Sequence, residues 1–119
     1  MTPRLTDLKP LQGLKLRALA LDTTSVEDLS PLKGMPLKYL NLDRTRVKDL
    51  SPLKGMKLEG FAYFETPVED ISVLKDMPLH MVECNFQRER DEAVLRSLKT
   101  LETINGKPAA QFWKEVDGR

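Results

Sequence analysis

The chain has 119 residues, with 19 Lys and Arg against 18 Asp and Glu, which gives a formal net charge of +1. This length fits one domain, and the balanced charge excludes the basic surface that most nucleic-acid-binding proteins carry. No apolar run approaches the roughly 20 residues that span a bilayer, and the N-terminus lacks the apolar segment of a signal peptide. The single cysteine excludes an intrachain disulfide and favours a reducing compartment, so we predict a cytoplasmic protein.

The sequence repeats itself with a period of 21 residues. The segment DLSPLKGM occupies 28–35 and recurs unchanged at 49–56, and looser copies lie at 7–14 and 70–77. Apolar residues therefore fall into aligned columns, of which one holds Leu19, Leu40, Phe61 and Val82. Repeats of this kind bury their core only between neighbouring units. We predict a solenoid over residues 1–91, with units at 8–28, 29–49, 50–70 and 71–91.

Each unit contains signals for one strand and one short helical turn. The alternation of Leu40 and Leu42 with outward residues has the period of 2 that is typical of a half-buried strand. The Ser-Pro pairs at 30–31 and 51–52 indicate an N-cap followed by the first helical position, and Gly34 and Gly55 end the turn. Because 21 residues cannot hold a strand and a full helix, we predict a short 3₁₀ turn.

The spacing L-x-x-L-x-L at Leu37, Leu40 and Leu42 resembles the leucine-rich repeat family in its short bacterial, internalin-like form, over residues 5–105. The resemblance implies an α/β solenoid with one curved parallel sheet of about five strands and 3₁₀ turns on the convex side. Where the family carries Asn at the turn, this chain has Thr, whose hydroxyl can still bond the turn backbone; these residues are Thr24, Thr45 and Thr66.

The last part of the chain, 92–119, is predicted to be a helical C-terminal cap. Residues 92–98 indicate one helix, Leu101 and Ile104 a final strand, and Asn105-Gly106 a turn. A second helix follows Pro108, and we expect Trp113 on it to be mostly buried. The segment 100–116 also resembles the C-terminal end of leucine-rich segments in bacterial multidomain proteins, often serine/threonine kinases, although it contains no kinase motif.

The N-terminal end carries no comparable cap. The chain begins in the middle of a repeat, so Leu16, Leu19 and Leu21 would form an edge strand over an uncovered leucine layer. Exposed edges recruit partners. We therefore predict either a homodimer through this edge or residues 1–15 folded over it. The incomplete first repeat would also be expected if the chain were cut from a longer protein.

Candidate catalytic and metal-binding residues favour structural roles. His80 and Cys84 lie four residues apart on one strand, about 13 Å, which is too far for a Cys–His pair. Phosphate-binding loops, dinucleotide-binding glycines and zinc-helix motifs are missing from the sequence, so we predict neither enzyme activity nor a cofactor. One aspartate recurs in each unit, as Asp28, Asp49, Asp70 and Asp91. Such a column could hold calcium, but each Asp precedes a turn whose backbone N–H groups it can accept, so we predict capping and no metal.

Two surface columns are candidates for partner binding. Lys33, Lys54 and Lys75 form the first, which we interpret as a solvated convex face, with a site for an acidic partner as the alternative. The second follows from the resemblance, which implies that residues between the core leucines lie on a concave face. Large apolar residues there are typical of binding surfaces. The predicted partner-binding residues are Tyr39, Asn41, Asp43, Phe64, Met81, Glu83, Asn85 and Phe86; for Phe86, packing into the cap is the alternative.

The function that these patterns favour is non-catalytic binding of a protein or peptide through the concave face, with no role for nucleic acid or membrane. The best-matched partner carries an apolar side chain beside Lys or Arg, because Asp22, Asp43 and Glu83 would surround the apolar residues. The alternative function is a structural spacer or assembly segment of a larger signalling protein.

Overall fold

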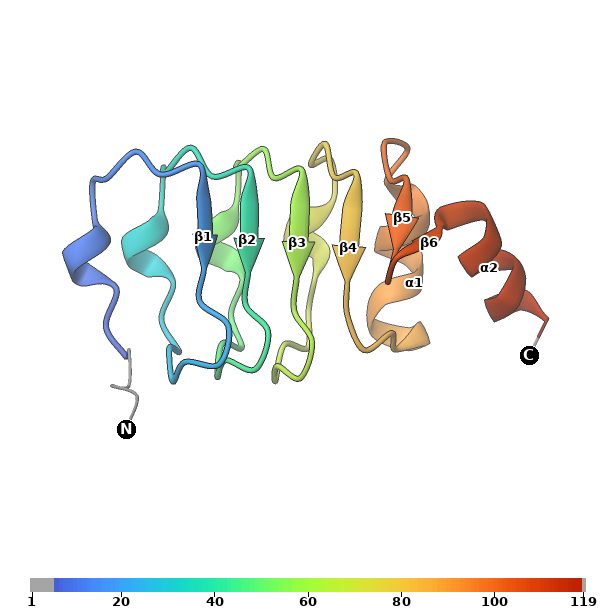
Figure 1. Cartoon of the computed structure of the whole chain (residues 1–119), viewed down its shortest axis with the longest axis horizontal. Helices are drawn as coiled ribbons and strands as arrows, with labels where there is room; N and C mark the ends of the chain where they lie inside the picture. Colours follow the sequence, from blue (N-terminus) through green and yellow to red (C-terminus); the bar gives the residue numbers. More distant parts are fainter. Residues whose placement is uncertain (1–5, 119) are drawn as a thin grey trace.

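A computed structural model of the chain describes residues 6–118. They form an elongated stack of coils with extents of 45 × 29 × 21 Å. Each coil contains one short strand and one helical segment, and successive coils lie side by side along the long axis (Figure 1). The predicted 21-residue unit is therefore one turn of the solenoid.

The strands form one six-stranded sheet in the order of the chain. They are β1 Ala18–Ala20, β2 Tyr39–Asn41, β3 Gly60–Ala62, β4 Met81–Glu83, β5 Thr103–Ile104 and β6 Lys107–Pro108. The first five are parallel, as predicted, and Ala18, Tyr39, Gly60 and Met81 pair in register because they hold the same place in the repeat. β6 adds an antiparallel edge through a two-residue turn in which Asn105 and Gly106 have φ of 53° and 80°. Asn-Gly favours this turn because both positions need positive φ.

The 3₁₀ turns form a second row beside the sheet, with the first two to the left of β1 and the later ones behind the strands in Figure 1, on the side predicted to be convex. They are η1 Lys9–Leu11, η2 Ser30–Leu32, η3 Ser51–Leu53 and η4 Ser72–Leu74. The prediction that Ser30 and Ser51 are N-caps is wrong, since both residues lie inside the turns and neither serine side chain forms a capping hydrogen bond there. The carboxylates of Asp28, Asp49 and Asp70 instead accept the backbone N–H two residues later, each at 2.8 Å. These three aspartates therefore cap the first residue of each turn, as predicted.

The core lies between the sheet and the turns. Leu32, Leu53 and Leu74 are fully buried, as are Leu37, Leu58 and Leu79 on the return path. The threonines of the strand-to-turn corner hold the backbone as expected, because Thr24, Thr45 and Thr66 donate to the carbonyls of Leu21, Leu42 and Tyr63. Each coil thus repeats the same core position and the same corner bond.

The first coil packs less completely than those that follow it. Leu14 is 46% exposed, and Leu11, Leu16 and Leu19 are half-buried, whereas their counterparts in the second coil are buried. Residues 6–15 form the outer part of this coil and do not cover it, and residues 1–5 lie outside the described part. A partial leucine layer at this end agrees with the uncapped edge predicted from the sequence, while the homodimer remains a prediction.

The C-terminal cap contains the helices α1 Arg88–Ser97 and α2 Ala109–Asp117. α1 begins at Arg88 rather than at the predicted Glu92. The helix therefore begins before the end of the fourth predicted unit, 71–91. It replaces the 3₁₀ turn of the last coil and adds Leu95 and Leu98 to the common core. α2 closes the far end of the stack (Figure 1).

Two neighbouring aromatic side chains, Phe112 and the predicted Trp113, anchor α2. Phe112 is buried at 7% exposure, whereas Trp113 is intermediate in exposure. The guanidinium of Arg96 lies 4.2 Å from the centre of the Trp113 ring and covers it from the solvent side. Trp113 packs against the main core and against the small apolar cluster of Ile104, Phe112 and Val116, so the expectation that most of its surface is buried agrees with the structure.

Candidate functional site

A pocket of about 440 Å³ lies over the middle of strands β1 to β4, on the face of the sheet that points away from the core. We call it the sheet-face pocket. Its outward-facing lining residues are Ala18, Ala20, Tyr39, Asn41, Gly60, Ala62, Met81 and Glu83. The alternation of the strands produces this face, because Leu40, Phe61 and Val82 point into the core and are at most 3% exposed.

Two large apolar side chains converge in the sheet-face pocket. Tyr39 is 48% exposed and Met81 40%, and within residues 6–118 only Leu14 joins them as a large, exposed apolar residue. Gly60 pairs with both, on the strand between them. A Cβ atom at Gly60 would lie 2.8 Å from Tyr39 Cδ1 and 3.2 Å from Met81 Cε. The missing side chain therefore leaves the space above the middle strand into which both residues extend.

Several predicted polar site residues serve the backbone instead. Asn41 Oδ1 accepts the N–H of Asp43 at 2.8 Å, and Asp43 Oδ1 accepts the N–H of Phe64 in the next coil at 2.8 Å. Asn85 Oδ1 accepts the N–H of Glu65 at 2.6 Å. Asn41 and Glu83 line the pocket, whereas Asp43 and Asn85 lie beyond the strand ends and connect successive coils. These bonds between coils were not predicted.

The two predicted phenylalanines lie outside the sheet-face pocket. Phe64 follows the end of β3 and is half-buried. Phe86 packs into the cap, where its ring centre lies 5.2 Å from that of Phe112 and 5.8 Å from that of Trp113. The alternative location of Phe86 is thus the one found. The fold gathers Tyr39, Asn41, Met81 and Glu83, and separates Asp43, Phe64, Asn85 and Phe86 from them.

A row of charges lies where the strands begin. Glu59 pairs with Lys38 at 3.3 Å and lies 3.7 Å from His80 Nε2, and His80 Nδ1 lies 4.0 Å from Glu102. His80 therefore faces carboxylates. Cys84, by contrast, is buried, and its burial raises the pKa of the thiol to about 11. A thiol that stays protonated and has no imidazole beside it is a poor nucleophile, in agreement with the predicted structural role of Cys84.

Comparison with solved structures identifies the repeat. Internalin C2 from Listeria monocytogenes matches with a TM-score of 0.71 and 30% sequence identity, over 83% of this chain and 46% of its own. The chain has the leucine-rich repeat fold. It spans less than half of internalin C2, and the match confirms the predicted fold and the internalin-like form of the repeats. No family model and no curated protein matches the sequence.

The stack of coils contains a buried ionic group that was not predicted from the sequence. Asp91, fully buried, accepts two hydrogen bonds from Arg90, at 2.6 and 2.8 Å, and one from the Tyr63 hydroxyl at 3.0 Å. It also accepts the backbone N–H of Gln87 at 2.8 Å. Asp91 therefore does not begin a 3₁₀ turn like the other members of its column, because α1 occupies that place. Tyr63, in a column that otherwise holds leucine and cysteine, was the available signal, since a buried phenol requires a partner.

The surroundings of this group shift two pKa values. Burial raises the pKa of Tyr63 far above its ordinary value. Burial alone would lower the pKa of Arg90, but its hydrogen bond to Asp91 and the charge of that carboxylate raise it overall. Arg90 also donates to the carbonyls of Val68 and Asn85, at 3.1 and 2.9 Å. The group thus ties α1 to the third and fourth coils of the leucine-rich repeat.

Residues 6–118, which the structure describes, contain no group of three or more His, Cys, Asp or Glu side chains placed to hold a metal ion. Among the same residues, no helix has the length and apolar character needed to cross a membrane.

Proposed function

We propose that the chain is a non-catalytic protein- or peptide-binding module that acts through the sheet-face pocket. The observation that carries the proposal is the convergence of Tyr39 and Met81 over Gly60, in a molecule whose other large apolar side chains are mostly buried. An apolar side chain from a partner that enters this pocket removes exposed aromatic and thioether surface from water. The likeness to internalin C2 supports a binding role for the repeat, while the surface used and the partner belong to the proposal.

The charges around the pocket favour a partner with a cationic residue next to its apolar one. Glu83 lines the pocket beside Met81, and Asp22 is exposed just after β1. Such rim charges mainly set the rate and selectivity of association. The two apolar anchors would therefore supply most of the affinity, and the carboxylates would select Lys or Arg.

The experiment selects peptides from a random display library on the wild-type chain and measures the selected peptides by titration. We expect enriched sequences with an apolar residue beside Lys or Arg, and an affinity loss of about 30-fold or more in the double variant Tyr39→Ala, Met81→Ala, which is about 2 kcal/mol, the loss that defines a hot spot. Gly60→Val should have the same effect by filling the pocket. Phe64→Ala, outside the pocket, is the matched control.

The result that contradicts the proposal is equally defined. If the selected peptides bind the double variant and Gly60→Val as tightly as the wild type, while both variants melt as the wild type does, the sheet face is not the binding surface. A library that yields no enriched sequence would favour the spacer function.

A second candidate, assembly through the N-terminal edge, rests on the exposure of Leu14 and the incomplete burial of Leu11 and Leu16. An apolar end layer of this kind favours association with a second copy. Light scattering across a concentration series tests it. We expect a dimer that Leu14→Lys dissociates; a wild-type chain that stays monomeric at all concentrations would contradict it.

A further inference from the structure

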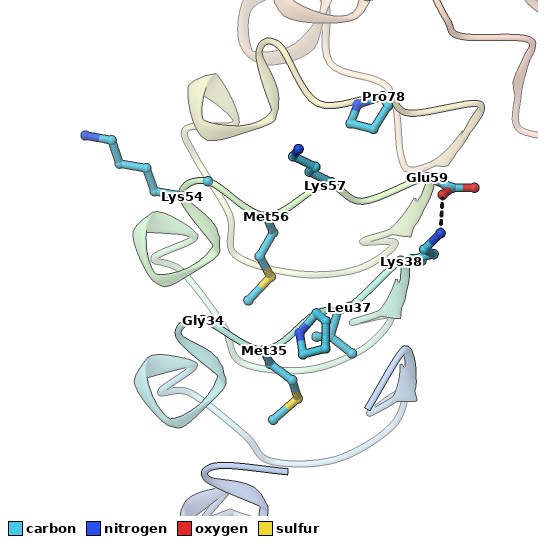
Figure 2. Close-up of a pocket in the computed structure, with 11 residues that line it drawn as sticks. Gly34, Met35, Leu37, Lys38, Lys54, Met56, Lys57, Glu59 and Pro78 are labelled. Carbon is cyan, nitrogen blue, oxygen red and sulfur yellow. Dashed lines mark ion pairs between the residues drawn. The ribbon is translucent and has the colours of Figure 1, made fainter. Parts of the chain in front are cut away.

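A second hollow runs along the edge where the chain returns from the turns to the strands, over residues 34–38, 54–59 and 72–78. We call it the edge groove. Two pockets of about 490 and 640 Å³ lie there, and both are lined by Lys54, Gly55, Met56 and Lys57. The two pockets are neighbours on either side of these shared residues, and together they extend over three successive coils. Figure 2 shows the first of the two pockets.

The lining of the edge groove is largely apolar. The repeat places one methionine per coil at the same position, as Met35, Met56 and Met77, and Pro36 and Pro78 lie beside them. The methionine side chains are 5–7% exposed and belong to the core, so they form the floor of the groove. The apolar surface that a ligand can reach comes from Pro36, Pro78 and Val73. Gly55 leaves the main chain uncovered, since a Cβ atom added there would meet nothing within 4 Å. A peptide can therefore approach the backbone of this loop closely.

The charged side chains of the edge groove are mostly cationic and unpaired. Lys54, Lys57 and Lys75 are exposed, and none of them forms an ion pair or side-chain hydrogen bond with any residue of 6–118. Of the two carboxylates in the groove, Glu59 is held by Lys38 at 3.3 Å, at the strand end of the pocket (Figure 2). Asp76 is the other. Within the described residues, the edge groove therefore has three unpaired ammonium groups and one unpaired carboxylate.

We propose that the edge groove docks an acidic segment of a partner protein, with its carboxylates on Lys54, Lys57 and Lys75 and an aliphatic side chain against the prolines and valine of the lining. The charge complementarity selects the acidic segment, and the apolar lining selects the aliphatic residue. Parallel strands lie about 4.8 Å apart, so the three coils span about 10 Å, which about three extended residues cover. The site is separate from the sheet-face pocket, with which it shares no lining residue.

The lining favours a peptide over a nucleic acid. Binding of single strands uses aromatic side chains for base stacking together with a continuous cationic track. The edge groove is lined by no aromatic residue and no arginine, and Glu59 and Asp76 interrupt its positive charge. Proline and valine in place of aromatic rings suit aliphatic side chains.

The test measures fluorescence anisotropy of labelled synthetic peptides on the full chain. The probe alternates Glu with Leu, and the comparison peptides replace Glu by Lys or Leu by Ser. We expect the Glu-Leu peptide alone to bind well, and Lys54→Glu with Lys57→Glu to weaken it by about tenfold or more. Lys99→Glu with Lys114→Glu, which changes the net charge equally at exposed positions outside the groove, should change it by less than about twofold.

Three results would overturn the proposal. They are no binding of the Glu-Leu peptide, an equal loss in both charge-reversed variants, and displacement of the peptide by an oligonucleotide of equal charge. The double variant Lys54→Ala, Lys57→Ala provides the same comparison if charge reversal disturbs folding. Tyr39→Ala should leave this binding unchanged, so failure here and failure of the sheet-face proposal are distinguishable.

Discussion

The Tyr63 hydroxyl donates a hydrogen bond of 3.0 Å to the carboxylate of Asp91, 28 residues later in the chain. Tyr63 follows β3, and Asp91 lies in the first turn of α1, so the bond connects the regular repeats to the cap. Both side chains are buried, and the Arg90 guanidinium, 5.0 Å from the centre of the Tyr63 ring, completes the contact. The attachment of the cap therefore depends on a satisfied polar group as well as on apolar packing.

Removing either partner of this bond should destabilise the chain by different amounts. Tyr63→Phe keeps the ring and leaves Asp91 with one acceptor bond fewer, at a cost of about 1–3 kcal/mol. Asp91→Ala leaves the buried Arg90 charge unpaired and should cost about 3–5 kcal/mol. Urea unfolding measures both. Tyr39→Phe, whose hydroxyl is exposed, is the control and should change stability little. A Tyr63→Phe variant as stable as that control would contradict the role of the bond.

The aromatic residues of α2 provide a second test of the cap. Phe112 is buried more completely than Trp113, so Phe112→Ala should lose about 3–5 kcal/mol of unfolding free energy and Trp113→Ala clearly less. Chemical denaturation of the two single variants gives the comparison. If the order is reversed, Trp113 and not Phe112 is the stronger anchor of the helix.

The single cysteine should be inert in the folded chain. With a pKa raised to about 11 by burial, only about one Cys84 thiol in a thousand is ionised at pH 8. We expect slow labelling by a disulfide reagent in buffer and rapid, complete labelling in denaturant, followed by absorbance. Rapid labelling of the native chain would mean that Cys84 is accessible after all.

The aspartates that begin the turns should make stability depend on acid. Hydrogen bonds from Ser30, Ser51 and Ser72 lower the pKa values of Asp28, Asp49 and Asp70 below the ordinary 3.8. A lowered pKa in the folded chain means that the unfolded chain binds protons first as the pH falls. The stabilisation is thus present above pH 3.8 and is lost as the pH falls through the lowered values.

Replacing all three by Asn keeps an oxygen that accepts the same N–H and removes the titration. We expect the unfolding free energy of this triple variant to fall less than that of the wild type between about pH 5 and about pH 2. Urea unfolding at several pH values measures the difference. Parallel pH profiles for the two chains would show that these carboxylates do not contribute.

The repeat itself could be predicted from the amino-acid sequence alone. A column such as Leu19, Leu40, Phe61 and Val82 recurs at one spacing, and any structure that buries it must stack equivalent strands in register. The Asp residues before the turns could be predicted as well, because an Asp two residues before a free N–H acts locally. Local chemistry that repeats in every coil leaves few alternatives.

The candidate sites depend on contacts between coils, which a one-dimensional pattern does not specify. Tyr39 and Met81 are 42 positions apart by their numbers, and both extend over Gly60 because that residue has no side chain. Phe64 and Phe86 lie beyond the strands, where the alternation of faces stops, so turn and cap geometry decided where each one packs. Asp91 became buried because α1 replaced a turn. Sequence periodicity determined the coils, and tertiary packing decided which side chains from different coils came into contact.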